Sequence, residues 1–450
     1  MVPRLVIAGT GSGVGKTTIA TGLMSLLSRG GKVQGFKVGP DFIDPMFHQA
    51  ATGRPSRNLD SFFMDHATIR NLFGWSTRDA DLAIVEGVRG LYEGLTSTGD
   101  VGSTAEIAKL LEAPVVLVVN ARSLGKSAAA QVLGYKMLDP QVRIEGVILN
   151  QVSGERHRAK ATEAVERLTG TRVVGAIERS RESMPERHLG LVTAEEQDLP
   201  SILGRMEEML VDIDLDLLEE IARSAVDREF PRESPFPRAR YGGKVAVPRD
   251  RAFSFYYREN IESMEAAGLE IEHFSPLEGD PLPDADACYL GGGYPEVHAS
   301  RLAENLDFLE GVRNLSDEGK LVYGECGGML VMCRSIGNEG GGHRMAGIFP
   351  YDAELTRDRQ GLSYVMARGT EDNFMFPLRE IRGHEFHYTR LIPTPRTVFG
   401  YEIVRGKGID GGHDGLMARR TIGTYMHQHA LSNRDWGVAW GRSIADEYHL

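Results

Sequence analysis

Residues 7–20, IAGTGSGVGKTTIA, have the types and spacing of a phosphate-binding loop. Glycines let backbone N–H groups close around phosphates, Lys16 brings a positive charge to the outer phosphates, and Thr17 offers a hydroxyl to Mg²⁺. The helix that starts here adds roughly half a positive charge. Thr10 stands where the strict pattern has its first glycine. We expect a nucleotide to contact the loop at Gly11, Gly13, Gly15, Lys16, Thr17 and Thr18.

Cys326 is the residue whose surroundings best fit a nucleophile. It lies in GECGG (324–328), between an apolar run typical of a strand and an apolar run typical of a helix. A residue held between glycines at such a corner is exposed on a sharp turn, which is the nucleophile-elbow arrangement with cysteine in place of serine. The helix start is expected to lower the thiol pKa from its usual value of about 8.5. Cys288 and Cys333 lie inside apolar segments and are expected to be core residues.

A cysteine nucleophile needs an oxyanion site and a base. The glycines at 291–293 end a neighbouring predicted strand, and Gly292 and Gly293 can present backbone N–H groups without side-chain obstruction. The base must be a histidine from elsewhere in the chain. Two clusters contain candidates, GHEFHY at 383–388 and GTYMHQH at 423–429. Their spacings also suit a metal, but no further cysteine or histidine cluster completes a zinc set.

Acidic residues follow two of the predicted strands in the first half of the chain. Asp41 and Glu86 are the expected Mg²⁺ ligands, together with Thr17, because hard cations take oxygen ligands. Lys37 is expected to help bind the γ-phosphate or the intermediate that it forms. Other readings remain open: Asp41 or Asp44 caps the next helix, or Glu86 pairs with a surface arginine.

Two polar stretches follow later strands. In NQVSGERH (150–157), the side-chain amide of Asn150 is placed to read an adenine edge. The stretch PERHLGL (185–191) combines polar residues with glycine. Each is a candidate nucleotide or substrate contact, or a plain loop.

The elements that must position these residues alternate between strand and helix in the first half. Apolar runs predict strands at 32–39, 82–87, 114–120, 144–150 and 173–177. Continuous rather than alternating apolar runs suit a parallel sheet covered by helices on both faces. Ligands bind outside the carboxyl ends of the strands in such sheets, which is where the candidate residues fall.

The second half opens a further α/β pattern, with strands expected at 244–247, 269–274, 287–290 and 321–325. Between the halves, residues 228–240 contain prolines and mixed charge without an apolar face, which is typical of an interdomain linker. We therefore expect an ATP-binding domain at 1–227, a linker at 228–240 and a second domain at 241–450.

Composition excludes several classes of function. With 41% apolar and 25% charged residues, the 450-residue chain has the balance of a soluble globular protein. No apolar run approaches the ~20 residues of a membrane helix, and no signal-peptide pattern precedes the first strand, so we expect a cytoplasmic protein without a membrane partner. A net charge of −12 disfavours nucleic acid as a partner. An anionic small molecule held in a locally basic cleft is still compatible with that charge.

The motifs together resemble the cobyrinic acid a,c-diamide synthase family, and the resemblance extends over nearly the whole chain. Members join a P-loop domain similar to dethiobiotin synthetase to a class I-like glutamine amidotransferase domain, both of α/β class. The matching motifs are GTGSGVGKTT, FKVGPDFIDP, NLDSFFM, EGVRGLYEG, NQVSGERH, PERHLGL, RDRAFSFYY, LGGGYPE, ECGGM, GHEFHYTR and GTYMHQH.

The resemblance implies a reaction at two sites. Cys326 would attack the amide of L-glutamine, with His427 as its base, and release ammonia. Ordinary class I enzymes carry His-x-Glu, whereas the third position here is His429, so a glutamate-oriented triad is not expected. At the other site MgATP would phosphorylate a carboxylate of an anionic tetrapyrrole, and ammonia would displace the phosphate, in turn at the a and c carboxylates. ATP and Mg²⁺ are the implied cofactors, and a homodimer is left open.

The expected contacts with the acceptor are Asp44, Arg89 and Tyr92. The family commonly reads EGVMGLYDG, whereas this chain has Arg89 for methionine and Glu93 for aspartate. An arginine there would favour a more anionic or differently metallated tetrapyrrole, and relatives amidate nickel-sirohydrochlorin on the route to coenzyme F430. Cobyric acid synthase, a MinD-type partitioning ATPase and a noncatalytic scaffold are weaker alternatives. The partitioning ATPases carry a lysine where this chain has Gly11.

Overall fold

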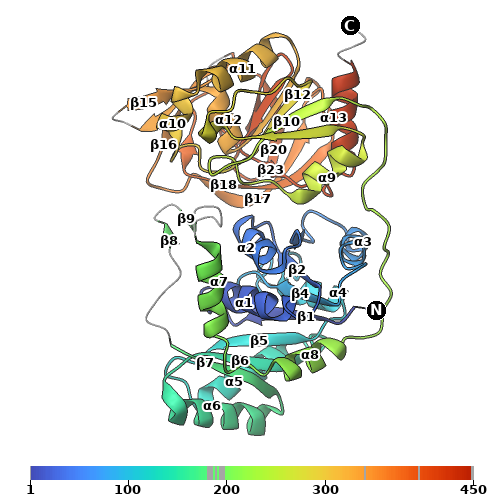
Figure 1. Cartoon of the computed structure of the whole chain (residues 1–450), viewed down its shortest axis with the longest axis vertical. Coiled ribbons are helices and arrows are strands. Elements are labelled where there is room, and N and C mark those ends of the chain that lie inside the picture. The colour runs from blue at the N-terminus through green and yellow to red at the C-terminus, as the bar shows by residue number, and fades with distance from the viewer. Residues whose placement is uncertain are drawn as a thin grey trace. The chain divides into compact units, whose positions relative to one another are not determined.

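The computed structural model describes residues 2–179, 186–187, 190–191, 198–338, 341–393 and 396–446. The chain forms two compact units, Met1–Pro235 and Phe236–Leu450, and each is described by itself (Figure 1). The division falls inside 228–240, the segment that the sequence predicts as a linker. No helix among the described residues is both long enough and apolar enough to cross a membrane.

The described part of the first unit contains a seven-stranded parallel sheet in the order β3-β2-β4-β1-β5-β6-β7. Its strands are β1 (Arg4–Gly9), β2 (Val33–Val38), β3 (Arg57–Leu59), β4 (Leu82–Glu86), β5 (Val115–Asn120), β6 (Ile144–Val152) and β7 (Arg172–Glu178). The predicted strands are confirmed. The short edge strand β3 was not predicted, because three residues are too few to show a pattern.

Helices connect these strands. They are α1 (Lys16–Ser28), α2 (Ile43–Thr52), α3 (His66–Ser76), α4 (Thr104–Leu110), α5 (Lys126–Leu138), α6 (Gly154–Thr169), α7 (Leu199–Glu208) and α8 (Leu215–Arg223). A short pair, β8 (Glu186–Arg187) and β9 (Gly190–Leu191), precedes α7. One core cluster joins Leu5 and Ile7 of β1 to Leu23 of α1 and Ile221 of α8. The helices on this face therefore bury the strand that leads into the phosphate loop.

The register of the parallel strands aligns the ends that carry polar residues. Ile7 of β1 pairs with Glu86 of β4, and Glu86 pairs in turn with Lys37 of β2. The residues after Gly9 therefore leave the sheet at the same edge as Lys37 and Glu86. This edge is the carboxyl end of the strands, where ligands of such sheets bind.

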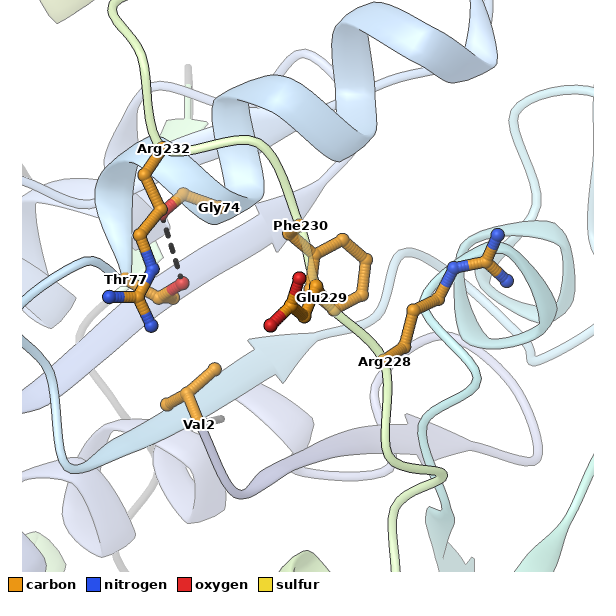
Figure 2. A pocket seen from close by; sticks show the side chains of 7 residues that line it. All are labelled: Val2, Gly74, Thr77, Arg228, Glu229, Phe230 and Arg232. Atoms are coloured by element: carbon orange, nitrogen blue, oxygen red, sulfur yellow. Dashed lines mark hydrogen bonds between the residues drawn. The ribbon is translucent and has the colours of Figure 1, made fainter.

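The predicted linker begins with a stretch that packs on the first unit. The Phe230 ring lies edge-on to Phe73 of α3, with 4.9 Å between ring centroids, and the Arg4 guanidinium lies 5.1 Å from the Phe230 ring. Phe230 lines a pocket of about 410 Å³ together with Val2, Gly74, Thr77, Arg228, Glu229 and Arg232. Figure 2 shows how these side chains lie. Residues 228–240 were expected to lack an apolar face, so this anchoring by one aromatic side chain is a correction.

The described part of the second unit contains a ten-stranded mixed sheet in the order β11-β10-β12-β13-β22-β21-β20-β17-β18-β23. Its parallel strands are β10 (Lys244–Pro248), β11 (Glu270–Phe274), β12 (Ala287–Leu290), β13 (Leu321–Glu325) and β22 (Thr421–Thr424). Its antiparallel strands are β17 (Gly361–Gly369), β18 (Glu380–His387), β20 (Phe399–Arg405), β21 (His413–Ala418) and β23 (His427–Gln428). A smaller sheet contains β14 (Cys333–Asn338), β15 (Gly341–Arg344), β16 (Phe349–Leu355) and β19 (Thr389–Arg390).

Helices cover both faces of the parallel part of this sheet. They are α9 (Arg258–Ala266), α10 (Ala299–Glu304), α11 (Leu306–Asp317), α12 (Gly327–Met332) and α13 (Trp436–Ala445), with a 3₁₀ turn, η2 (Pro276–Glu278). Cys288 and Val322 belong to one core cluster, whereas their strand neighbours Tyr289 and Tyr323 belong to another. Cys333 is fully buried as predicted, but it begins β14 and is not part of the helix, because it pairs with Phe349 of β16.

Two candidate active sites

The phosphate loop connects β1 to α1. Gly13 and Gly15 have φ angles of 71° and 94°, in the left-handed region that favours glycine. A Cβ on Gly15 would lie 2.4 Å from Nδ2 of Asn150, so a side chain there would displace the Asn150 amide. The Lys16 ammonium donates to the Gly11 carbonyl at 2.8 Å. Burial, together with the nearby charge of Lys37, lowers the pKa of Lys16 to about 8.

Asn150 contacts this loop directly. Its Nδ2 donates to the Val14 carbonyl at 2.8 Å, and its Oδ1 accepts a hydrogen bond from the Gln151 N–H at 2.9 Å. Both ends of the amide are therefore engaged in holding backbone. These hydrogen bonds hold Asn150 against the loop, and its contact with an adenine edge stays a prediction.

A buried cluster of carboxylates lies beside the loop. The Thr17 hydroxyl lies 2.7 Å from Glu86 Oε1 and 3.3 Å from Asp44 Oδ2. The Lys37 ammonium bridges the same two carboxylates, at 2.5 Å from Asp44 and 2.8 Å from Glu86. Burial and the charges of Asp41 and Glu86 raise the pKa of Asp44. Burial opposes ionisation of Glu86 as well, but the charge of Lys37 holds the pKa of Glu86 below its usual range.

Asp41 is engaged with the backbone beside this cluster. Its Oδ1 accepts a hydrogen bond from the Ile43 N–H at 2.8 Å, at the start of α2. The first turn of α2 instead directs Asp44 toward Thr17. One hydroxyl and two carboxylates fit the oxygen ligands of Mg²⁺, which is usually held by one or two carboxylates together with phosphates and water. Asp44 is thus a further candidate ligand, the role of Asp41 as a ligand stays a prediction, and Glu86 is too deeply buried for a surface ion pair.

His48 is a member of this cluster that sequence reasoning missed. Its Nε2 lies 2.7 Å from Glu86 Oε2 and its Nδ1 lies 3.1 Å from the Ser56 hydroxyl. The ring is fully buried. His48 thus holds the Glu86 oxygen that Thr17 does not contact. A histidine four residues after Asp44 on the predicted helix is the signal that could have indicated it.

The loop that follows β4 lies against the phosphate loop, since the Leu91 N–H donates to the Gly9 carbonyl at 2.9 Å. Arg89 is exposed on this loop and has a left-handed φ of 49°. Tyr92 donates to the Tyr135 carbonyl at 2.6 Å, and their rings stack with centroids 5.6 Å apart. Tyr135 in turn donates to the Thr10 carbonyl at 2.7 Å. The candidates Arg89 and Tyr92 therefore lie on a loop that is tied to the phosphate loop.

The stretch 185–191 falls largely outside the described residues. Only the backbone pairing of β8 with β9 is described there, so its role as a substrate contact stays a prediction.

In the second unit, Cys326 occupies the corner between β13 and α12. Its backbone has φ 47° and ψ −104°, an unusual conformation for a residue with a side chain, and its N–H donates to the Thr424 carbonyl at 2.7 Å. The thiol lies 3.8 Å from the Phe386 carbonyl. This backbone conformation is that of a nucleophile held on a strained turn.

The pKa of the Cys326 thiol differs from the expectation. Burial raises it, as does the charge of Glu296, and a hydrogen bond from the Gly327 N–H opposes this only in part. The expected lowering by the helix start is therefore wrong for the described structure. The physical reason is that α12 is only six residues long, whereas the thiol is buried and has carboxylates nearby.

The two predicted oxyanion donors differ in their contacts. The Gly292 N–H donates to the Phe255 carbonyl at 3.2 Å, so it is already engaged. Gly293 lies beside the start of α12, since a Cβ on Gly327 would be 3.3 Å from the Gly293 nitrogen. Gly327 directly follows the nucleophile, and a nucleophile elbow uses the N–H of that residue. Sequence reasoning missed Gly327, although its position after Cys326 indicates this role.

His427 lies on β23 next to this corner. A Cβ on Gly292 would be 2.4 Å from Cε1 of His427, so the glycine allows the ring to approach the end of β12. On the other side, Nδ1 of His427 is 3.5 Å from Oε2 of Glu325, the residue before Cys326. His429 instead has its Nε2 3.5 Å from Oε2 of Glu259. A carboxylate therefore does lie beside His427, which the sequence did not predict.

The two histidines of 383–388 pack against neighbouring aromatic rings. His384 pairs with His427 across β18 and β23, and their rings stack with centroids 5.0 Å apart. Burial and the neighbouring His427 lower the pKa of His384, which keeps it neutral. His387 stacks on Tyr425 at 3.7 Å. Within the described ranges, no three histidine, cysteine, aspartate or glutamate side chains group in a way that could hold a metal ion.

Comparison with known proteins assigns a family to each half. Residues 5–192 match the CobQ/CobB/MinD/ParA nucleotide-binding domain, and residues 244–435 match the CobB/CobQ-like glutamine amidotransferase domain. The chain is 46% identical to a cobyrinate a,c-diamide synthase of Methanosphaera stadtmanae, over 98% of both chains. It is 47% identical to a protein of that name from Methanothermobacter thermautotrophicus, over 95% of this chain and 96% of the relative.

A third relative, from Archaeoglobus fulgidus, has the same name and is 43% identical over 96% of this chain and 95% of its own length. The likeness covers both units, so it includes the phosphate loop and the cysteine corner together. A nucleotide-binding domain and a glutamine amidotransferase domain in one chain are the parts of a glutamine-dependent ligase. The chain belongs to the cobyrinate a,c-diamide synthase family.

Proposed function

We propose that this chain uses ATP and glutamine to convert the a and c carboxylates of a tetrapyrrole, cobyrinic acid, into amides. One observation carries the proposal: a Cys326 corner with His427 beside it occurs in the same chain as a phosphate loop whose Thr17 contacts two buried carboxylates. We assign the ATP-dependent step to the domain 1–227 and the release of ammonia to the domain 241–450.

In the glutaminase step, His427 takes the proton of the Cys326 thiol, and the sulfur bonds to the amide carbon of glutamine. The N–H groups of Gly293 and Gly327 stabilise the oxyanion that forms. The C–N bond then breaks, and His427 returns the proton to the leaving nitrogen, which departs as ammonia. Water hydrolyses the thioester to glutamate and restores the thiol.

In the ligase step, Lys16 and the loop N–H groups bind the phosphates of ATP, and Lys37 contacts the phosphoryl group that is transferred. Thr17, Asp44 and Glu86 would hold Mg²⁺, which neutralises phosphate charge when it is bound. A carboxylate oxygen of the acceptor bonds to the γ-phosphorus as the bond to ADP breaks. Ammonia attacks the acyl carbon, loses a proton and displaces inorganic phosphate.

The exposed Arg89 favours a second candidate acceptor of the same class. An arginine on the loop beside the phosphate site adds positive charge where the acceptor carboxylate must approach. Nickel-sirohydrochlorin is therefore the alternative acceptor.

The test supplies purified full-length protein with MgATP and glutamine, and with cobyrinic acid or nickel-sirohydrochlorin in separate reactions. Products are followed by mass spectrometry, and ADP and glutamate are measured in parallel. We expect diamide from cobyrinic acid with ADP and glutamate formed in step with it. Diamide from nickel-sirohydrochlorin alone would favour the alternative acceptor, and no amide from either would contradict the proposal.

A further inference from the structure

A buried carboxylate beside the proposed base has no role in the steps above. Glu325 ends β13, directly before Cys326, and its Oε2 lies 3.5 Å from Nδ1 of His427. Glu325 is fully buried and His427 is 2% exposed. We propose that Glu325 is the positioning residue that orients the His427 imidazole for the glutaminase reaction. This inference rests on the proposed glutaminase activity of Cys326.

Other contacts hold the Glu325 carboxylate in place. Its Oε1 accepts a hydrogen bond from the Gln428 N–H at 3.2 Å, and its Oε2 accepts one from the Tyr289 hydroxyl at 3.1 Å. Asn260 donates to the Tyr289 oxygen at 3.1 Å and to the Gln428 carbonyl at 2.9 Å. The carboxylate and the strand that carries His427 are therefore tied into one network, which restricts how each can turn relative to the other.

The chemistry requires such a partner. A carboxylate facing Nδ1 keeps the proton on that nitrogen and leaves the lone pair of Nε2 to accept the thiol proton. Its negative charge also stabilises the imidazolium that forms when Cys326 is deprotonated. Burial raises the pKa of the Cys326 thiol, so its proton is harder to remove than that of an exposed thiol. The reaction therefore depends more strongly on a base, His427, that is held by a carboxylate.

The titratable groups beside the pair are Cys326, which follows β13, and His384 on β18, which stacks on His427. Tyr289 on β12 and Tyr323 on β13 lie near Glu325, whose charge acts on both. Glu296 and Asp414 act on Cys326 through their charge. His384 is kept neutral by burial, and the two tyrosines have pKa values raised by burial. Glu325 is thus the group whose charge lies directly at Nδ1 of His427.

A neighbouring pair supplies a matched control. Nε2 of His429 and Oε2 of Glu259 are separated by the same 3.5 Å, and these side chains are 0% and 1% exposed. His429 occupies the third position that carries glutamate in ordinary class I enzymes. Replacing Glu259 removes a buried carboxylate beside a histidine of the same segment without touching the pair at His427.

The experiment compares Glu325→Gln and Glu259→Gln in the full-length chain. For Glu325→Gln we expect the glutamine-dependent kcat to fall by about 10²-fold, with ammonia-dependent synthesis unchanged. The acid limb of its kcat/KM profile for glutamine should move to lower pH, because a lost negative charge disfavours the imidazolium. Glu325→Asp, which retains the charge, should recover part of the lost rate. Glu259→Gln should leave both the rate and the acid limb near those of the wild type.

An acid limb that does not move in Glu325→Gln, or an equal loss of glutamine use in Glu259→Gln, would overturn the assignment. Thermal unfolding of each variant separates this result from a general loss of fold. If the wild-type chain released no glutamate, or if Cys326→Ala still released it, the proposed function would itself be wrong. If the wild-type chain did release glutamate and Glu325→Gln released it at the same rate, only the role of Glu325 would be wrong.

Discussion

The Thr17 hydroxyl lies 2.7 Å from Glu86 Oε1, although 69 residues separate the two along the chain. Thr17 opens α1 after the phosphate loop, and Glu86 ends the neighbouring strand β4. The parallel register that pairs Ile7 with Glu86 brings them to one edge of the sheet. The same edge receives Asp44 from the first turn of α2. The cation site proposed for the ligase step therefore depends on three segments meeting there.

Asp44→Asn should raise the Mg²⁺ concentration needed for half-maximal activity by about 10-fold or more, because it removes a charged oxygen ligand. The measurement is ADP formation with ammonia as nitrogen source, titrated with Mg²⁺. Asp41→Asn is the matched control. It affects a residue whose Oδ1 accepts a hydrogen bond from the Ile43 N–H, so it should cost about 1 kcal/mol of stability or less and leave the Mg²⁺ requirement unchanged. A larger effect in Asp41→Asn would show that the ligand assignment is reversed.

Cys326→Ala should abolish glutamine-dependent synthesis and glutamate release, because the acyl-accepting sulfur is lost. Synthesis with added ammonium chloride should continue, since the ligase step needs only ammonia. Cys333→Ala is the control, because Cys333 is equally a cysteine but is fully buried in a core cluster. The division of labour between the two domains would be wrong if Cys326→Ala lost activity with both nitrogen sources while remaining folded.

ATP binding should weaken as the pH rises through about 8, because the pKa of Lys16 is lowered to about 8 and the deprotonated amine no longer attracts phosphate. The measurement is the affinity for a nonhydrolysable ATP analogue, determined by calorimetry between about pH 6.5 and 9.5 in steps of about one pH unit. Lys16→Arg keeps its charge over this range and should remove the dependence. Lys16→Ala should stop synthesis with either nitrogen source. A pH dependence that persists in Lys16→Arg would assign the titration to another group.

Arg89→Met should raise the KM for the tetrapyrrole by about 10-fold, because a hydrogen bond to a charged group contributes about 1.5–3 kcal/mol. The KM values for ATP and glutamine should not change. Arg89→Lys retains the charge and serves as the control. The assay compares cobyrinic acid with nickel-sirohydrochlorin at equal concentration. Unchanged acceptor preference and KM in Arg89→Met would exclude Arg89 from acceptor recognition.

The sequence by itself determined the fold class and the two places to inspect. The phosphate loop and the glycine-flanked Cys326 are contiguous motifs, so the residues next to each other in the sequence are enough to predict the local backbone geometry. The parallel strands were predicted because each is a continuous apolar run. Such features depend on interactions within a few residues, so they can be read without knowing how the chain folds.

Only the tertiary structure decided which side chains meet at each site. Asp41 and Asp44 have the same chemistry and stand three residues apart, and the structure directs Asp44 toward Thr17 while Oδ1 of Asp41 accepts a hydrogen bond from the Ile43 N–H. Glu325 and His427 are 102 positions apart in sequence number and come together because β13 pairs with β22, which places Thr424, three residues before His427, beside Glu325. Burial likewise reversed the expected pKa shift of Cys326. These outcomes depend on register, on the direction of a helix turn and on desolvation, and none of these is written in a local pattern.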